Sequence, residues 1–247
     1  ISEWMFDGGD TMTRNDSKKY VVRVSENALI SLVLSSLEAY SVKKKDIKEK
    51  GRPKSRIEVY GSLFGHEITL KNREVIYQIE MAHTDTTAEQ RRSSIDENKE
   101  AISLKVDVIT SFWPHLKYLG DFHSHPFKNT REVMASKMYC MSENDREWLN
   151  DNFWKQKGYR VGMVVTIAAM EKAGRKACNW VANNCVEATM GNYRMWLAAY
   201  CAYSARDKYL YTKDNDEFVM LDCPTLTGLQ WEYKDFGRFK NGRHMSS

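Results

Sequence analysis

The order of helix-like and strand-like segments along this chain constrains its fold more than any single motif does. From Ser25, a typical helix N-cap, apolar residues recur at helical spacing, so we expect a helix over residues 25–41. Short apolar segments predict strands at 57–64, 75–81, 118–122, 159–168 and 217–222, and further helices are expected at 94–113, 142–153 and 189–205. The segment 177–182 is expected to pair with the strand at 159–168. No regular βαβ repeat emerges, so the sequence predicts an α+β domain.

Composition narrows the class of protein. The chain has 247 residues, 42% of them hydrophobic, which is enough for a substantial core. A net charge of +4 is too weak for a dedicated nucleic-acid-binding protein. No segment is apolar enough to span a membrane, and the N-terminus lacks a signal-peptide pattern. The five cysteines form no CxxC pair, which favours a reducing cytoplasm.

Two polar stretches flank the first predicted helix. Residues 1–19 show no periodicity and are interpreted as an N-terminal arm or the remnant of a tag, with one domain expected over 20–247. The segment 43–56 is rich in lysine and arginine around Gly51 and Pro53. It is predicted to be a solvated loop, with docking of an acidic partner as the alternative.

The tetrapeptide His123-Ser124-His125-Pro126 closes the strand predicted at 118–122. In an extended chain, side chains two positions apart point the same way, so both imidazoles can reach one metal ion. We expect Pro126 to turn the chain out of the sheet immediately afterwards. A histidine pair with no metal, in the core or on the surface, is the alternative interpretation.

Two acidic residues extend this candidate site. Asp145 lies in the first turn of the helix predicted at 142–153, on the same side as its candidate cap Ser142, and would complete a three-ligand zinc site. Glu58 lies in an apolar predicted strand, where desolvation would raise its pKa towards the range of a general base. An ordinary helix start and a carboxylate on a sheet face are the respective alternatives.

Taken together, these motifs resemble those of the JAMM (MPN-plus, JAB domain) zinc metalloproteases. That family has a strand Glu before a small-residue stretch, then His-x-His-Pro, then Ser-x-x-Asp at a helix start, in the order found here. The resemblance covers roughly residues 20–205. It implies an MPN/JAB-type fold, in which helices flank a mixed, curved β-sheet with cytidine-deaminase-like layering. We expect the domain to end in an aromatic-rich C-terminal extension.

The chain departs from the family in one place. The segment 127–141, between Pro126 and Ser142, is longer than usual and is interpreted as an insertion that covers the site or shapes a groove. Because a longer loop costs little closure entropy, Asp145 can still return to the metal. The spacing does not require it, so alternative third ligands are Glu132 and Glu143. Cys140 is interpreted as a small apolar filler, or alternatively as a switch occupying the open zinc position.

The resemblance also implies a mechanism and a substrate. One Zn²⁺ per chain, held by His123, His125 and Asp145, activates water; Glu58 is the general base and Ser142 stabilises the oxyanion. The expected reaction is hydrolysis after the C-terminal Gly of a ubiquitin-like protein, in a precursor or a conjugate. The chain looks most like stand-alone bacterial deubiquitinase-like members in antiphage defence operons, so E1-like and E2-like enzymes are expected partners. The alternatives are a catalytically inactive MPN-like scaffold, a nucleic-acid-binding module and a hydrolase of small amides.

Overall fold

The computed structural model describes residues 19–42, 55–72, 74–90, 95–155, 158–171, 178–202, 219–229, 238–240 and 243–245. The expected N-terminal arm, apart from Lys19, lies outside these residues, as does most of the basic segment, residues 43–54. The helices are α1 (Glu26–Ser41), α2 (Lys99–Phe112), α3 (Thr130–Ser136), α4 (Glu143–Lys155) and α6 (Pro224–Thr227). The strands are β1 (Tyr20–Val24), β2 (Tyr60–Thr69), β3 (Val75–Thr84), β4 (Glu89–Gln90), β5 (Ile95–Asp96), β6 (Lys117–Phe127), β7 (Val161–Ala169), β8 (Asn179–Ala182), β9 (Cys185–Met190), β10 (Tyr193–Cys201), β11 (Val219–Asp222), β12 (Arg238–Lys240) and β13 (Arg243–Met245).

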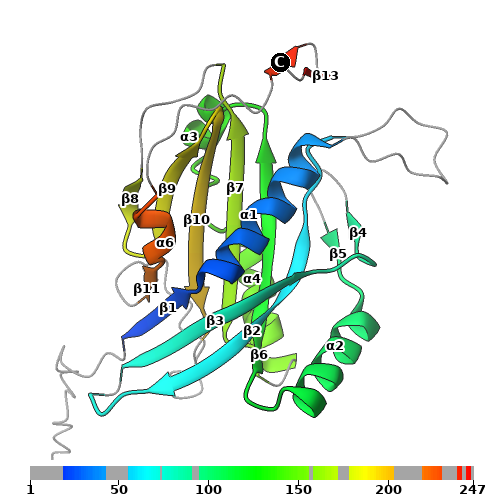
Figure 1. Cartoon of the computed structure of the whole chain (residues 1–247), viewed down its shortest axis with the longest axis vertical. Coiled ribbons are helices and arrows are strands. Elements are labelled where there is room, and N and C mark those ends of the chain that lie inside the picture. The colour runs from blue at the N-terminus through cyan, green and yellow to red at the C-terminus, as the bar shows by residue number, and fades with distance from the viewer. Residues whose placement is uncertain are drawn as a thin grey trace, which may run out of the picture.

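Within the described residues, nine strands form one mixed sheet in the order β11-β1-β3-β2-β6-β7-β10-β9-β8. The pairs β1–β11, β1–β3 and β6–β7 are parallel, and the other neighbours are antiparallel. Figure 1 shows the sheet curling, so that β2 and β3 run obliquely to β7 and β10. The predicted α+β class is therefore confirmed, with a single curled mixed sheet at its centre.

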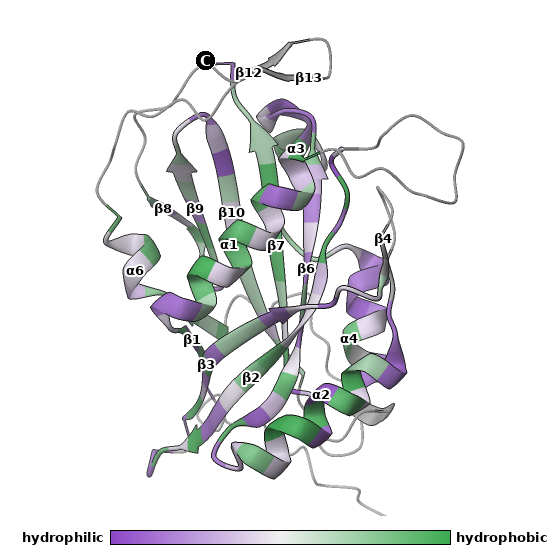
Figure 2. Cartoon of the chain, turned by 45° about the vertical axis from the view of Figure 1, so that its right-hand side comes forward, coloured by the Kyte–Doolittle hydropathy of each residue, from purple (hydrophilic) through white to green (hydrophobic). Residues whose placement is uncertain are grey.

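Helices cover both faces of this sheet. One cluster of buried side chains joins the sheet to α1 and α6, and a second joins it to α2, α3 and α4. Figure 1 shows α1 lying across one face, and Figure 2 shows α2 and α4 on the other side. The central strand β7 alternates between the clusters: Val165 packs on the α1 side and Val164 on the α4 side. Burial on both faces explains why β7 reads as a continuous apolar run.

The first helix is as predicted. α1 begins after Ser25, whose hydroxyl accepts a hydrogen bond from the N–H of Ala28. Its buried face includes Leu29, Leu32 and Tyr40, which share a helical stripe. α4 and β7 also match their predicted positions, whereas α2 begins at Lys99, capped by Asn98, and not at residue 94.

The hairpin of β2 and β3 confirms the predicted neighbours but shifts the first strand. β2 begins at Tyr60 and continues through Gly65 to Thr69, so Glu58 lies in the segment before the strand. The register shifts at Gly65, where an added Cβ would come within 1.8 Å of the carbonyl oxygen of Gln78. Glycine is needed there because the two backbones approach too closely for any side chain.

The expectation that Pro126 turns the chain out of the sheet is wrong. β6 continues through Pro126 and pairs in parallel with β7 as far as Phe127. The N–H of Ser124 donates to the carbonyl oxygen of Val59, so it faces the β2 side of β6. The backbone nitrogen of Pro126, two residues later in the strand, faces the same side. Pairing of β2 with β6 extends only to Tyr60 opposite His123, so β2 offers position 126 no strand partner. A proline fits such a position because β7 does not need its missing N–H.

The helix expected at 189–205 is also wrong, because the described part of this region, up to residue 202, contains the end of β9 and all of β10. β9 and β10 make a hairpin across Gly191 and Asn192, and Gly191 adopts a φ of 59°. A glycine with positive φ beginning a two-residue turn is a hairpin signal. β10 is buried on both faces, so it lacks the alternation of apolar and polar residues that marks a strand. The segment expected to pair with β7 forms β8 instead, which pairs with β9 at the sheet edge.

Among the described residues, no helix combines the length and the hydrophobicity that a membrane crossing requires.

Candidate metal centre

Strand β6 presents His123 and His125 on the same side of the sheet. Because they are two residues apart in an extended strand, their side chains point the same way, as the sequence predicts. The two Nε2 atoms lie 3.0 Å apart. The side chain of His123 is 13% exposed and that of His125 is 7% exposed. The pair therefore lies just below the surface, within reach of a small ligand.

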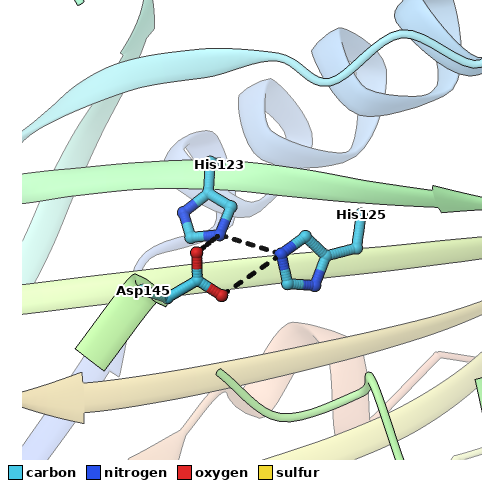
Figure 3. Close-up of side chains that lie close together, drawn as sticks. All are labelled: His123, His125 and Asp145. Carbon is cyan, nitrogen blue, oxygen red and sulfur yellow. Dashed lines mark hydrogen bonds and ion pairs between the residues drawn. The ribbon is translucent and has the colours of Figure 1, made fainter. Parts of the chain in front are cut away.

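Helix α4 brings Asp145 to this pair. Asp145 Oδ1 lies 3.2 Å from His123 Nε2, and Oδ2 lies 3.4 Å from His125 Nε2. Figure 3 shows both imidazole rings directed at the one carboxylate. The lengthened segment 127–141 thus does not prevent Asp145 from joining the histidines.

The start of α4 fixes the position of the carboxylate. The Ser142 hydroxyl accepts from the N–H of Asp145 at 3.2 Å, and the Ser142 N–H donates to Asp145 Oδ2 at 2.7 Å. This reciprocal pair of bonds is a capping box, which holds the first helical turn in place. The same arrangement therefore starts the helix and sets the direction of the Asp145 side chain.

The three side chains have the spacing of a tetrahedral zinc site. Nitrogen and oxygen ligands of zinc lie about 2.0–2.2 Å from the metal, which places neighbouring tetrahedral corners about 3.3–3.6 Å apart. The separations of 3.0, 3.2 and 3.4 Å among His123, His125 and Asp145 are close to this range. Among the described His, Cys, Asp and Glu residues, this is the one group of three or more that could hold a metal ion.

The charges in the cluster favour a cation. Burial disfavours the charged form of His123, but the hydrogen bond and charge of Asp145 outweigh it and raise the pKa of this imidazole. Burial likewise opposes the ionisation of Asp145, yet both histidines hold the pKa of this carboxyl well below its usual range. The Asp145 carboxylate thus remains ionised and requires a positively charged partner. Protonated histidines supply that charge in the metal-free protein, and a divalent metal ion can replace their protons.

Glu58 lies beside the three candidate ligands without being one of them. Its side chain is partly buried, and burial is the main cause that raises its pKa from 4.5 to about 7. The charge of His123 lowers this pKa and that of Asp145 raises it, so all three groups interact. A carboxyl group that titrates near neutral pH can accept and return a proton, as general acid–base catalysis requires.

Ser124 attaches the Glu58 segment to β6. Its N–H donates to the carbonyl of Val59 at 2.9 Å, and its hydroxyl accepts from the N–H of Val59 at 2.9 Å. Both groups are buried. Ser124, which lies between the two histidines, therefore holds Val59, the residue that follows Glu58.

The Ser142 side chain is directed at Asp145. Its hydroxyl donates to Asp145 Oδ2 at 2.7 Å, so the carboxylate oxygen nearest His125 accepts from both the hydroxyl and the backbone N–H of Ser142. The predicted oxyanion role for Ser142 stays a prediction. In the arrangement observed here, its hydroxyl orients the candidate third ligand.

The segment 127–141 contributes to the site from the side of His125. The carbonyl oxygen of Met138 lies 3.4 Å from His125 Nδ1 and accepts a hydrogen bond from Thr166 Oγ1 at 2.8 Å. Since a carbonyl oxygen can only accept, the Nδ1 atom must carry the proton in this contact, which leaves Nε2 available to a metal. The segment 127–141 thus supplies a backbone group that orients a candidate ligand.

The alternative ligands and the cysteine are not part of this group. Glu132 lies in the first turn of α3, where it accepts from the N–H of Lys128 and from the side-chain amide of Asn129. Glu143 is exposed at the start of α4, and Cys140 is partly buried. The group of described residues that could hold a metal ion contains none of Glu132, Glu143 or Cys140.

A buried carboxylate near the site was not predicted. Asp121 lies in β6 two residues before His123 and is 2% exposed. It accepts hydrogen bonds from Tyr60, Trp148 and Tyr159. The sequence feature that could have identified it is an aspartate inside an apolar strand, spaced by two residues from His123 so that both side chains point to the same face.

A scan of the chain against protein-family models finds no match, and a search of the curated proteins finds no significant one. The assignment of a function therefore depends on the motifs and on the geometry of the cluster.

Proposed function

We propose that the chain is a zinc-dependent isopeptidase of the JAMM type. The observation that carries this proposal is the convergence of His123, His125 and Asp145 at zinc-ligand spacing, beside a carboxyl group whose pKa is about 7. The three ligands come from two elements separated by an insertion, so their convergence is not a trivial result of sequence proximity. Two histidines and one carboxylate form the donor set of a hydrolytic zinc site, and the adjacent glutamate can serve as its general base.

The fold agrees with this proposal at the level of architecture. An MPN/JAB-type domain has a curved mixed sheet between helices, and the curled sheet here is covered by α1 on one face and by α2 and α4 on the other. His123 is rigidly held, because it pairs with Tyr60 of β2 on one side and with Val164 of β7 on the other, and His125 pairs with Thr166 of β7. We therefore propose the MPN/JAB fold together with the activity.

His123, His125 and Asp145 would hold the zinc ion. Zinc bound there would supply a water of lowered pKa and polarise the scissile carbonyl. Three protein ligands leave a fourth position open, as a catalytic site requires.

The protein's own groups then account for the proton transfers. Glu58 accepts the proton of the attacking water as the C–O bond forms, and it donates that proton to the leaving amine as the C–N bond breaks. The products are a carboxylic acid and a free amine, so atoms and charge balance. Ser142 keeps the Asp145 carboxylate oriented through its hydroxyl. Stabilisation of the developing oxyanion by that hydroxyl is part of the proposal that comes from the resemblance.

The substrate class comes from the resemblance. We propose the bond after the C-terminal Gly of a ubiquitin-like protein, in a precursor or in a conjugate to a lysine amine. An extended C-terminal tail is the kind of ligand that pairs with a strand edge, which gives affinity without dependence on side chains. A bacterial, cytoplasmic conjugation system with E1-like and E2-like enzymes is the proposed setting.

The test is cleavage of ubiquitin-like proteins fused through their terminal Gly to a reporter, with the new C-terminus mapped by mass. Glu58→Gln is expected to lower the rate at least about 100-fold while zinc remains bound, because only the base is lost. His125→Ala is expected to lose both zinc and activity. Glu67→Gln, an exposed residue of β2, is the matched control and should behave as the wild type.

The outcomes separate the rival functions. Equal rates in wild type and Glu58→Gln would contradict the assigned base. A wild-type protein that binds zinc and cleaves small amides but none of the fusions would contradict the substrate class. A protein that binds the fusions without zinc and without cleavage would be the inactive scaffold.

A further inference from the structure

Asp121 connects several elements behind the metal centre. Its Oδ1 accepts from the Tyr159 hydroxyl at 2.8 Å, and its Oδ2 accepts from Trp148 Nε1 at 3.0 Å and from the Tyr60 hydroxyl at 3.2 Å. A buried carboxylate is costly unless its oxygens are satisfied, and these donors satisfy both. A single side chain of β6 is thereby tied to β2, to α4 and to the residue that leads into β7.

The bond to Trp148 matters most for the site, because Trp148 and Asp145 lie on the same helix. They are three residues apart, so they are neighbours on one face of α4. Asp121 and His123 are two residues apart on β6 and share a face of the strand. The Trp148–Asp121 bond thus runs beside the Asp145–His123 contact and joins the same two elements.

Apolar packing alone would hold α4 less specifically. Leu149 is fully buried, and a Cβ added at Gly162 would come within 2.7 Å of it, so α4 packs closely on β7. Such packing is not directional, whereas a hydrogen bond is. A carboxylate about 6 Å from a helix axis moves about 2 Å when the helix rotates by about 20°. A displacement of that size would remove Asp145 from the ligand positions.

The length of segment 127–141 leaves a role for such a directional contact. Residues 127–141 separate the histidines from α4, so the covalent connection does not determine how α4 is rotated relative to β6. We infer that Trp148 and Asp121 are positioning residues that set the rotation of α4 and thereby deliver Asp145 to the metal. This inference rests on the ligand set of the proposed function. It adds the groups that hold the third ligand in place.

The experiment compares Trp148→Phe with Trp196→Phe in the full chain. Trp196 is 1% exposed, and its indole N–H has no hydrogen-bond partner among the described residues, so this control loses the same atoms without losing a bond. Zinc affinity is measured by competition with a chelator, and Co²⁺ spectra report the geometry of the site. Trp148→Phe is expected to weaken zinc binding by about 10-fold or more, as loss of a group supporting a ligand typically does. Trp196→Phe is expected to stay within about twofold of the wild type, since it leaves the ligands unchanged.

A second measurement keeps the anchoring testable without metal. In the metal-free protein, amide hydrogen exchange over 143–149 is expected to be faster in Trp148→Phe than in Trp196→Phe, because α4 has lost its polar anchor. If Trp148→Phe does not fold, Asp121→Asn is compared with Trp196→Phe in its place. The asparagine amide group is a donor, so it cannot accept the hydrogen bonds that one Asp121 oxygen accepts.

Equal zinc affinity in the two tryptophan variants would overturn the inference. If the wild type binds no zinc, the proposed function fails, and the exchange measurement alone decides whether Trp148 and Asp121 hold α4. Equal exchange in both variants would then overturn the inference as well.

Discussion

Ser124 Oγ accepts a hydrogen bond from the backbone N–H of Val59 at 2.9 Å, and this bond joins the candidate ligand strand to the segment that carries the candidate base. Ser124 lies between His123 and His125, and Val59 directly follows Glu58. This buried hydroxyl therefore helps to hold the base near the ligands, together with the bond from the Ser124 N–H to the Val59 carbonyl.

Replacing that hydroxyl should separate catalysis from metal binding. We expect Ser124→Ala to lower kcat by about 10-fold or more while zinc affinity changes little, because a general base must stay within hydrogen-bond reach of its proton. Ser124→Thr keeps the hydroxyl and should recover most of the activity. The control is Ser62→Ala, a buried serine of β2 whose hydroxyl has no hydrogen-bond partner among the described residues. Equal kcat in both alanine variants would remove Ser124 from this role.

The raised pKa of Glu58 predicts a pH-dependent effect on stability. In the metal-free protein the pKa of this carboxyl rises from 4.5 to about 7 on folding, so the folded state binds the proton more tightly than the unfolded state does. Ionisation of Glu58 therefore reduces stability progressively as the pH rises from 4.5 to about 7. Glu58→Gln removes this loss. It should be more stable than the wild type by on the order of 2 kcal/mol above pH 7, with little difference near pH 4.5.

Denaturant unfolding of the chelator-treated protein at both pH values measures this difference. Glu67→Gln in β2 provides the control for removing one negative charge. A Glu58→Gln variant that gains nothing above pH 7 would show that Glu58 is not held in a desolvated position.

Metal binding should stabilise the protein through Asp145. Zinc present at 100 times its dissociation constant would add about 2.7 kcal/mol to the free energy of unfolding, because it binds the folded state alone. We expect Asp145→Asn to lose most of this increase, since an amide is a weak zinc ligand. Thermal unfolding with and without zinc measures it, and Asp107→Asn on the exposed side of α2 is the control. A full zinc-dependent shift in Asp145→Asn would exclude Asp145 as a ligand.

The sequence predicted the parts of the fold and of the site that depend on local geometry. Ser25 as a helix cap, the shared direction of His123 and His125, and the Ser142–Asp145 helix start all follow from neighbours a few residues apart. The approach of Asp145 to the histidines agrees with the motif that the resemblance supplied. Spacing alone left it open, because the segment 127–141 is long.

The errors came from long-range packing. β10 is buried on both faces, which removed the alternation that would have identified a strand, and the turn at Gly191 was the remaining local signal. Pro126 stays in β6 because β2 does not extend alongside it, a fact about a distant segment. The role of Asp121 depends on Trp148 and Tyr159, which only the fold brings together.

The zinc content of the purified protein at neutral pH tests the central claim most directly. Elemental analysis after removal of loosely bound metal should find about one zinc per chain in the wild type and in His83→Ala, an exposed histidine of β3. It should find essentially none in His125→Ala, because two remaining ligands do not hold zinc tightly. A wild-type protein that takes up no zinc, or a His125→Ala variant that retains a full equivalent, would contradict the account.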